Sequence, residues 1–187
     1  KDLKILSKND LSKEYYEPYK VCTFSRVMEE KGIKHIINAI KDVNDKLGYE
    51  AYTLDIYGPV ETQFCEEFED LVYKNSKYVS YKGVVESNKS VEIIKNYFAL
   101  VFPTLFFTEG IPGTIIDAYA AGVPVISSRW ESFQDVVEDG ITGFGYEFGD
   151  YVALTKLLID IIKNPDMLID CKINALNKAI EFTPQNG

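Results

Sequence analysis

The segment FPTLFFTEGIPGTIIDAYAAGVPVISS, residues 102–128, gives the clearest indication of the fold. An apolar run over residues 99–103 predicts a buried strand, and a loop rich in glycine and proline follows it. The small and apolar residues of 114–121 then predict a short helix, which Gly122 ends as a C-cap. Residues 123–128 predict the next strand. A strand, a helix and a strand in this order predict parallel pairing with a right-handed crossover.

The same alternation extends outward in both directions. Further strands are expected over residues 19–26, 52–57, 78–84 and 141–148. Further helices are expected over residues 33–47, 61–74, 91–98, 151–163 and 165–182, and the last two are separated at Asn164-Pro165. Together these elements predict an α/β fold, a Rossmann-like, doubly wound, six-stranded parallel sheet with helices on both faces. Ligands of such sheets bind at the loops after the carboxyl ends of the strands.

Length and composition predict one domain with a real core. The chain has 187 residues, of which 46% are hydrophobic and 26% are charged. Residues 1–18 are polar with little periodicity, so we expect a linker or a frayed start there and a domain over 19–182. The longest apolar run, residues 97–107, is too short for a membrane-spanning helix of about 20 residues. No segment resembles a secretory leader, so we expect a cytoplasmic protein.

Charge and cysteine spacing exclude several classes of function. The net charge of −9 disfavours nucleic acid and anionic lipid as partners. Cys22, Cys65 and Cys171 form no C-x-x-C motif and predict three reduced thiols. The sequence lacks a P-loop and a G-x-G-x-x-G motif. It also lacks a D-x-D triad, so we expect no metal ion and require other groups to hold any phosphate.

Arg26 and Lys31 are the first candidates for that task. They lie in the loop after the first strand, in S-R-V-M-E-E-K-G, just before a helix. Arginine supplies a planar fork and lysine a point charge, and the two together neutralise a diphosphate without a metal. The alternative is a solvated charged loop, because Glu29 and Glu30 lie between the two cations.

The loop and helix start over residues 108–122 give the second candidate site. Glycines and a proline let the backbone approach a ligand, and the free amides of a first helical turn attract an anion. Glu109 and Asp117, eight residues apart, could both accept hydrogen bonds from a hydroxyl-rich ligand. Asp117 has a structural alternative, since Thr114 and Asp117 also match a capping box. Glu109 has no evident structural task in its loop.

Other polar residues are weaker candidates. His35 is the only histidine and lies on the first expected helix beside apolar residues, so a structural role is favoured over a catalytic base. Arg129 and Trp130 follow a strand at the ligand edge and could steer or stack on a substrate, although Trp130 could equally cover the core. A glycosidase with paired carboxylates is ranked low, because the sequence cannot show two carboxylates facing each other across a cleft.

Taken together, these stretches resemble the donor-binding half of the retaining glycosyltransferases of family 4 (group 1), which have two facing Rossmann-like domains, the GT-B fold. The likeness covers about residues 20–182. It rests on SRVMEEKGI at 25–33, LDIYG at 54–58, VSYKGVV at 79–85, the segment 102–128 and DVVEDGITGF at 135–144.

The resemblance implies a role for each candidate residue. Arg26 and Lys31 would bind the donor diphosphate, and Glu109, which we count with them as catalytic, would bind hydroxyls of the transferred sugar. Asp117 would take the ribose contact, although relatives usually have Glu there and Asp is one methylene shorter. By the same likeness Val84 would lie near the nucleobase. The backbone of the turn would lie near the phosphates, over Gly110, Ile111, Pro112, Gly113 and Thr114.

The resemblance also implies what this chain lacks. A complete enzyme has a second, amino-terminal acceptor domain, so we expect the chain to bind a nucleotide sugar weakly and to transfer nothing alone. UDP and GDP-mannose both stay open as donors, and a glycan or lipid-linked acceptor would bind through the absent domain. Peripheral membrane association of the full-length enzyme is a further expectation. Apolar surface on the 165–182 helix is expected to be exposed or to be covered by another copy.

Two other interpretations stay open. A nucleotide-sugar epimerase uses a similar two-domain architecture, but it needs acid and base residues near the sugar. A non-catalytic nucleotide-binding or interaction module would keep the fold without turnover. The presence of Arg26, Lys31 and Glu109 together favours the transferase.

Overall fold

Six parallel strands form one sheet in the part of the chain that the computed structural model describes, residues 3–11 and 14–183. The sheet order is β3-β2-β1-β4-β5-β6, so the order reverses direction between β1 and β4. The strands are β1 Tyr19–Phe24, β2 Tyr52–Tyr57, β3 Val79–Gly83, β4 Ala99–Phe102, β5 Val125–Ser128 and β6 Gly143–Tyr146. The predicted doubly wound fold is confirmed, and the switch point between β1 and β4 is where such sheets bind ligands.

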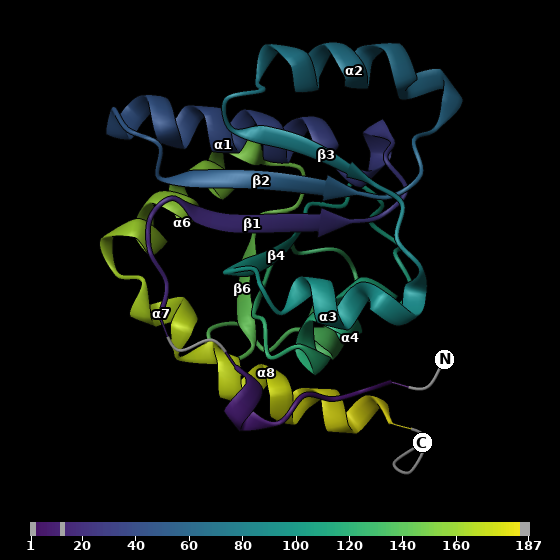
Figure 1. Ribbon diagram of the computed structural model, residues 1–187, viewed down its shortest axis with the longest axis vertical. Coiled ribbons are helices and arrows are strands. Elements are labelled where there is room, and N and C mark those ends of the chain that lie inside the picture. Colours follow the sequence, from purple (N-terminus) through teal and green to yellow (C-terminus); the bar gives the residue numbers. More distant parts are fainter. Residues whose placement is uncertain (1–2, 12–13, 184–187) are drawn as a thin grey trace.

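Helices cover both faces of the sheet (Figure 1). One face packs against α1 Ile33–Leu47, α2 Cys65–Lys74, α6 Tyr151–Lys163 and α7 Asp166–Ile169. The other packs against α3 Ser90–Ile94, α4 Gly113–Ala120, α5 Phe133–Val136 and α8 Cys171–Ala179. Single 3-10 turns occur at η1 Lys8–Asp10, η2 Glu29–Lys31, η3 Thr62–Phe64, η4 Ser87–Lys89 and η5 Ile180–Phe182. The core therefore consists of two apolar layers with the sheet between them.

Strand β4 shows why these residues form a central strand. Ala99 and Val101 enter the core layer with α1 and α6, whereas Leu100 and Phe102 enter the layer with α4 and α8. Successive side chains of a strand point to opposite faces, so a strand that is covered on both faces has an unbroken apolar sequence. Residues 99–102 have this unbroken apolar pattern in the sequence.

Element boundaries differ from the expected ones in a few places. The helix expected over 91–98 ends at Ile94, because the Phe98 amide already donates to the Lys20 carbonyl of β1, with an N–O distance of 2.8 Å. The strand expected from residue 123 begins at Val125, after Pro124, which has no amide hydrogen to donate. Helix α5 was not expected, since its four residues are too few for a periodic pattern.

The carboxyl-terminal helix is more buried than expected. The 165–182 segment forms α7, α8 and η5, and α8 packs along α4. Cys171, Ala175 and Leu176 of α8 are buried, whereas Ile173 of α8 and Ile180 of η5 stay exposed large apolar side chains. The expectation of exposed apolar surface is therefore wrong for most of this helix, because α4 is apolar on nearly every side and needs a cover.

Residues 3–11 belong to the stretch expected to be a linker or a frayed start, and they pack on the domain. Leu6 is buried, and its amide donates to the Ala120 carbonyl at 2.9 Å. Leu11 lies against Gly122 at the end of α4. Figure 1 shows this segment, in purple, beside α8. Residues 1, 2, 12 and 13 of the same stretch lie outside the described residues.

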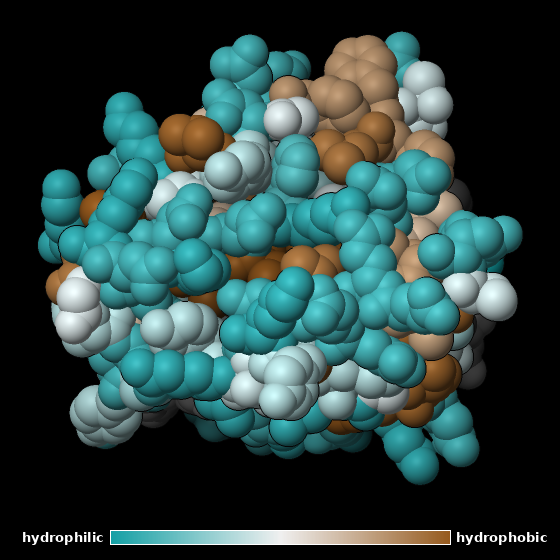
Figure 2. Space-filling model, turned by 90° about the horizontal axis from the view of Figure 1, so that it is seen from above, coloured by the Kyte–Doolittle hydropathy of each residue, from teal (hydrophilic) through white to brown (hydrophobic). Residues whose placement is uncertain are grey.

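The outer surface is mostly hydrophilic on the α2 side (Figure 2), with apolar side chains visible in a hollow near the centre of that view. No helix in residues 3–11 and 14–183 is both long enough and apolar enough to cross a bilayer. The exposed polar face agrees with the high content of charged residues.

Candidate functional site

Two loops meet at the switch point of the sheet. Residues 25–32 connect β1 to α1, and residues 103–112 connect β4 to α4. Gly32 adopts a φ of +74°, and a Cβ atom on it would lie 1.8 Å from the Pro103 carbonyl oxygen. The Leu105 amide also donates to the Glu30 carbonyl at 2.8 Å. The backbones of the two loops are therefore in direct contact, and only glycine permits this approach.

Lys31 and Glu109 form an ion pair between these loops. The Lys31 Nζ atom lies 2.9 Å from Glu109 Oε1 and 3.0 Å from Glu109 Oε2. The two side chains are 18% and 16% exposed, so the pair is mostly shielded but still open to a ligand. Charge-assisted contacts of this kind hold both groups in one geometry. Two candidates that lie 78 residues apart in the sequence thus come together at the expected edge of the sheet.

Thr104 is a third member of this cluster, and it was not among the candidate residues predicted from the sequence. Its side chain is fully buried, and its hydroxyl donates to Glu109 Oε2 at 2.6 Å. The same hydroxyl accepts a hydrogen bond from the Phe106 amide, and the Ser128 hydroxyl donates to the Thr104 carbonyl. A threonine inside an otherwise apolar run was the available signal, because a buried hydroxyl needs a partner.

Two aromatic rings surround the Lys31 ammonium. Its Nζ atom lies 5.2 Å from the centre of the Phe106 ring and 5.8 Å from that of Phe102. Ring faces attract a cation over this range. The lysine is therefore held by Glu109 on one side and by rings on another.

Arg26 and Val84 lie on the exposed part of this edge. Arg26 is exposed in the same loop as Lys31, and its guanidinium has no hydrogen bond or ion pair with any residue that the structure describes. Val84 directly follows β3 and is 67% exposed. Arg26 is thus a cation without a partner among the described residues, whereas the charge of Lys31 is already balanced by Glu109.

The start of α4 differs from the expected capping box. The N-cap is Pro112 and the helix begins at Gly113, so Thr114 is the second helical residue and makes no cap. The capping-box alternative is therefore wrong. The hydroxyl of Thr114 is buried and has no hydrogen-bond partner in the described chain, and Asp117 is 8% exposed within the helix. Of the turn before the helix, Gly110 and Ile111 are exposed and Pro112 is buried.

The remaining polar candidates lie in the packing of the domain. The His35 ring lies 5.6 Å from the Tyr151 ring of α6, and burial lowers the pKa of His35. Trp130 is 2% exposed and packs edge-on against Phe102, so it covers the core. Arg129 forms an ion pair with Asp139. In residues 3–11 and 14–183, no three histidine, cysteine, aspartate or glutamate side chains gather in a group suited to a metal ion.

Comparison with known proteins relates this geometry to one family. The family model described as glycosyl transferases group 1 matches residues 8–178. The capsular polysaccharide biosynthesis glycosyltransferase CapM of Staphylococcus aureus is 28% identical over 168 residues, which is 87% of this chain and 42% of CapM. The chain thus spans about two fifths of the length of this relative.

Solved structures show the same fold. The structure of Alr3699/HepE of Anabaena in complex with UDP has a TM-score of 0.76 at 18% identity and covers 87% of this chain and 44% of its own. The carboxyl-terminal domain of the glycosyl transferase group 1 family protein LpcC of Francisella tularensis has a TM-score of 0.74 at 18% identity. It covers 88% of this chain and 85% of its own. With a family model over nearly its whole length, this chain belongs to the group 1 glycosyl transferases.

Proposed function

We propose that this chain is the donor-binding half of a retaining glycosyltransferase that moves a hexose from a nucleotide diphosphate sugar to a glycan or lipid-linked acceptor. The observation that carries the proposal is the contact of Lys31 with Glu109 at the switch point between β1 and β4. A cation and a carboxylate side by side match the junction of a diphosphate with a sugar. The cation suits the phosphates, and the carboxylate accepts hydrogen bonds from hydroxyl groups.

The diphosphate is held without a metal ion in this proposal. Arg26 supplies the cation that has no partner in the described part of the chain, and Lys31 adds the ammonium hydrogen that Glu109 leaves free. The first amides of α4, at Gly113 and Thr114, point an additional positive end of a helix at the phosphates. As the sugar–phosphate bond breaks, these groups stabilise the charge of the departing diphosphate. Glu109 orients the sugar, and no protein base is needed when the acceptor attacks on the face that the diphosphate leaves.

The rest of the donor is assigned by position. Val84 offers an exposed apolar side chain for the nucleobase. Asp117 lies in the second turn of α4, and we assign the ribose contact to it. The turn that borders the phosphates consists of Gly110, Ile111 and Pro112. UDP is the first nucleotide to test, because the HepE structure has the same fold and contains UDP. GDP-mannose is the second.

The acceptor part lies outside this chain in the proposal. The relative CapM is more than twice as long, and its name assigns it to capsular polysaccharide biosynthesis. We therefore assign acceptor binding, any peripheral membrane association and turnover to the longer protein. We also propose that this longer protein takes part in polysaccharide assembly. Three free thiols, at Cys22, Cys65 and Cys171, agree with a cytoplasmic location.

Binding of nucleotides to the 187-residue chain tests the proposal. UDP, UDP-glucose and GDP-mannose are titrated by calorimetry and by thermal shift, with and without EDTA. We expect one nucleotide to bind equally well in EDTA, and Arg26→Gln to weaken its binding about tenfold, the loss of one charged contact. Lys46→Gln, an exposed lysine of α1, is the matched control.

Each outcome has a defined meaning. If no nucleotide raises the melting temperature, donor binding is refuted. If binding requires a divalent cation, the metal-free arrangement is refuted. If the chain transfers sugar to an acceptor by itself, the expectation that it is inactive alone is refuted, while donor binding stands.

A further inference from the structure

A second polar cavity lies on a face of the sheet, away from the two donor loops. Its volume is about 590 Å³, and its lining comes from the first three strands and from the α3 region. Lys20 of β1, Asp55 and Tyr57 of β2, and Lys82 of β3 form its floor, and Lys89 and Tyr97 lie at its side. None of its lining residues belongs to the loops 25–32 and 103–112. A ligand in this cavity would therefore be held by residues other than Arg26, Lys31 and Glu109.

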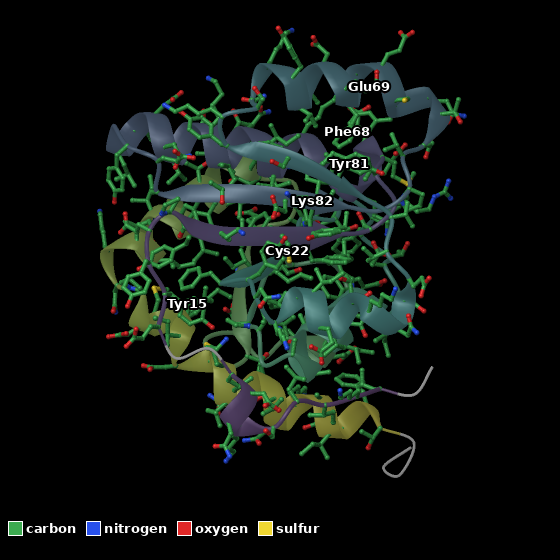
Figure 3. The ribbon with its side chains drawn as sticks, in the orientation of Figure 1. Tyr15, Cys22, Phe68, Glu69, Tyr81 and Lys82 are labelled. Atoms are coloured by element: carbon green, nitrogen blue, oxygen red, sulfur yellow. The ribbon has the colours of Figure 1, made fainter. Side chains whose placement is uncertain are left out.

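The cavity exists because this part of the sheet has one helix layer instead of two. Tyr81 and Phe68 meet edge-on at 5.3 Å under α2, so Tyr81 lies on the α2 face of β3. Lys82, the next residue, is labelled in Figure 3 and lines the cavity together with Asp55. The pairing of β2 with β3 shifts in register here, which leaves Lys82 between the paired residues Tyr81 and Gly83. Strand β3 is exposed over residues 80–82, whereas β4 is buried throughout. A parallel sheet is usually covered on both faces, and this uncovered area carries polar side chains instead of an apolar run.

Asp55 is a buried carboxylate at the bottom of this cavity. It is only 8% exposed, and the Tyr97 hydroxyl donates to its Oδ2 atom at 2.6 Å. The hydroxyls of Tyr57 and Tyr97 are 2.7 Å apart. Because Tyr97 gives its single proton to Asp55, Tyr57 donates to Tyr97. The three side chains thus form one directed chain of hydrogen bonds that ends on the carboxylate.

The charges around Asp55 are not satisfied by direct ion pairs. Within residues 3–11 and 14–183, no lysine lies within ion-pair distance of Asp55, and its Oδ1 atom makes no hydrogen bond. The register pairs Asp55 with Cys22 on one side and with Ser80 on the other. Lys20 of β1 and Lys82 of β3 line the same cavity as Asp55, one from each neighbouring strand. The lining also includes Lys89, which pairs with Glu86, and Glu92, which pairs with Lys4 and Lys95. Among the described residues, Lys20 and Lys82 are therefore the ammonium groups of the cavity without an ion pair, and they share its open space with Asp55.

We propose that this cavity binds an acidic carbohydrate, with a sugar hydroxyl that donates to Asp55 and a carboxylate or phosphate that pairs with Lys20 and Lys82. Lysine ammonium groups only donate, and an ionised carboxylate only accepts, so the ligand must offer both kinds of group. A bare inorganic anion would leave the Oδ1 atom of Asp55 without a donor and would be repelled by the carboxylate. A neutral sugar would leave both ammonium groups without a counter-charge. The inference goes beyond the proposed function and does not depend on donor binding.

Titration of the 187-residue chain by calorimetry and by NMR tests the proposal. The ligands are a trisaccharide of galacturonic acid, glucose 6-phosphate, neutral maltotriose and inorganic phosphate. We expect the trisaccharide or the sugar phosphate to bind, and the comparison between them identifies the preferred anionic group. Maltotriose and inorganic phosphate each lack one of the two features and should bind at least about tenfold more weakly. Affinity for the acidic ligand should fall as salt concentration rises.

Variants locate the binding. We expect Lys20→Gln and Lys82→Gln, combined, to weaken the acidic ligand about tenfold or more. Asp55→Asn keeps an acceptor for Tyr97 but replaces the free acceptor oxygen by a donor, so it should weaken the ligand as well. Lys156→Gln, an exposed lysine of α6 outside the cavity, is the matched control and should change nothing. Arg26→Gln should weaken nucleotide binding only.

Five results would overturn the proposal, four from binding and one from the oligomeric state. The first is that maltotriose binds as well as the acidic ligands, and the second is that neither acidic ligand shows saturable binding below about 10 mM. The third is unchanged binding in the lysine variants. The fourth is loss of binding of the acidic ligand in Arg26→Gln. The last would place the acidic ligand in the donor site. A concentration-dependent dimer that Lys82→Glu dissociates would assign the uncovered face to a second copy of this chain and would also refute it.

Discussion

The hydroxyl of Thr104 donates a hydrogen bond of 2.6 Å to Oε2 of Glu109, five residues further along the same loop. The Phe106 amide donates to the same hydroxyl, which leaves the threonine proton directed at the carboxylate. Lys31 contacts the carboxylate from the other loop. Glu109 is therefore oriented by two partners, and one of them is a neutral group that a single substitution can remove.

Thr104→Val should separate sugar recognition from nucleotide recognition. We expect the loss of this hydrogen bond to a charged group to lower the free energy of unfolding by about 1.5–3 kcal/mol. Affinity for the nucleotide sugar should fall, while affinity for the nucleotide alone stays unchanged, because only the sugar contacts Glu109 in the proposed function. Thr104→Ser keeps the hydroxyl and should restore both quantities. Equal weakening of both ligands by Thr104→Val would contradict this assignment.

Gly32→Ala should be far more harmful than Gly48→Ala. Both glycines have a positive φ, of 74° and 77°, so each substitution costs about 1–2 kcal/mol of backbone strain. A Cβ on Gly32 would also collide with the Pro103 carbonyl oxygen, whereas one on Gly48 meets nothing within 4 Å. We expect Gly32→Ala to cost at least about 2 kcal/mol more in chemical denaturation. Similar losses for the two variants would show that the loops separate readily.

Lys172→Met should stabilise the protein at neutral pH. The Lys172 ammonium is buried without a hydrogen-bond partner in the described chain and lies 5.0 Å from the centre of the Tyr15 ring. Burial lowers the pKa of Lys172 from 10.5 to about 8. We expect a gain of about 1–3 kcal/mol in the free energy of unfolding at pH 7, since each unit of pKa shift is worth about 1.4 kcal/mol.

The pH dependence gives an independent check on Lys172. Between pH 8 and 10.5 the unfolded lysine keeps its proton and the folded one has lost it, so the free energy of unfolding rises with pH in this window. Below pH 8 both forms are protonated and the destabilisation is complete. Denaturation at pH 7 and pH 9 should show this rise in the parent protein and in Lys156→Met, but not in Lys172→Met. A rise of equal size in Lys172→Met would contradict the assignment.

Tyr97→Phe should destabilise the protein more than Tyr57→Phe. Removal of the Tyr97 hydroxyl leaves the buried Asp55 carboxylate without its donor, at a cost of about 1.5–3 kcal/mol. Removal of the Tyr57 hydroxyl takes away a bond between neutral groups, worth about 1 kcal/mol. Urea denaturation of both variants, and of Tyr97→Phe with Asp55→Asn, measures the difference. A larger effect of Tyr57→Phe would contradict the assigned direction of the hydrogen bonds, from Tyr57 to Tyr97 to Asp55.

The parallel fold could be predicted from the sequence because its strands are buried on both sides and carry unbroken apolar runs. Ala99–Phe102 is the clearest case. The same pattern could not show where short elements end. The helix before β4 stops at Ile94 because the backbone must reach the sheet at Phe98, and this is a tertiary constraint. The burial of helix α8 was not predicted for a related reason. Its apolar side chains are buried because α8 packs on α4, and this packing joins distant segments of the chain.

The candidate site was predicted in part. Motif spacing identified Lys31 and Glu109, and the topology of a parallel sheet explains why loops after two adjacent strands meet. Thr104 was missed, because a single threonine in an apolar run does not reveal its partner. The capping box at Thr114 and Asp117 was wrong, because the helix starts one residue earlier than its apolar pattern indicates. The cavity at Asp55 had no sequence motif, since its residues come from three separate strands.

The backbone contact of Gly32 with Pro103 has a mechanical consequence for the proposed function. The two loops that hold the cation and the carboxylate are linked through their main chains and cannot open or close independently. Loops linked in this way favour an electrostatic geometry that is present before a ligand binds, so the proposed transfer would require little reorganisation during bond breaking. Any enclosure of the substrate must then come from a body that moves toward this edge, with the two loops as the fixed reference.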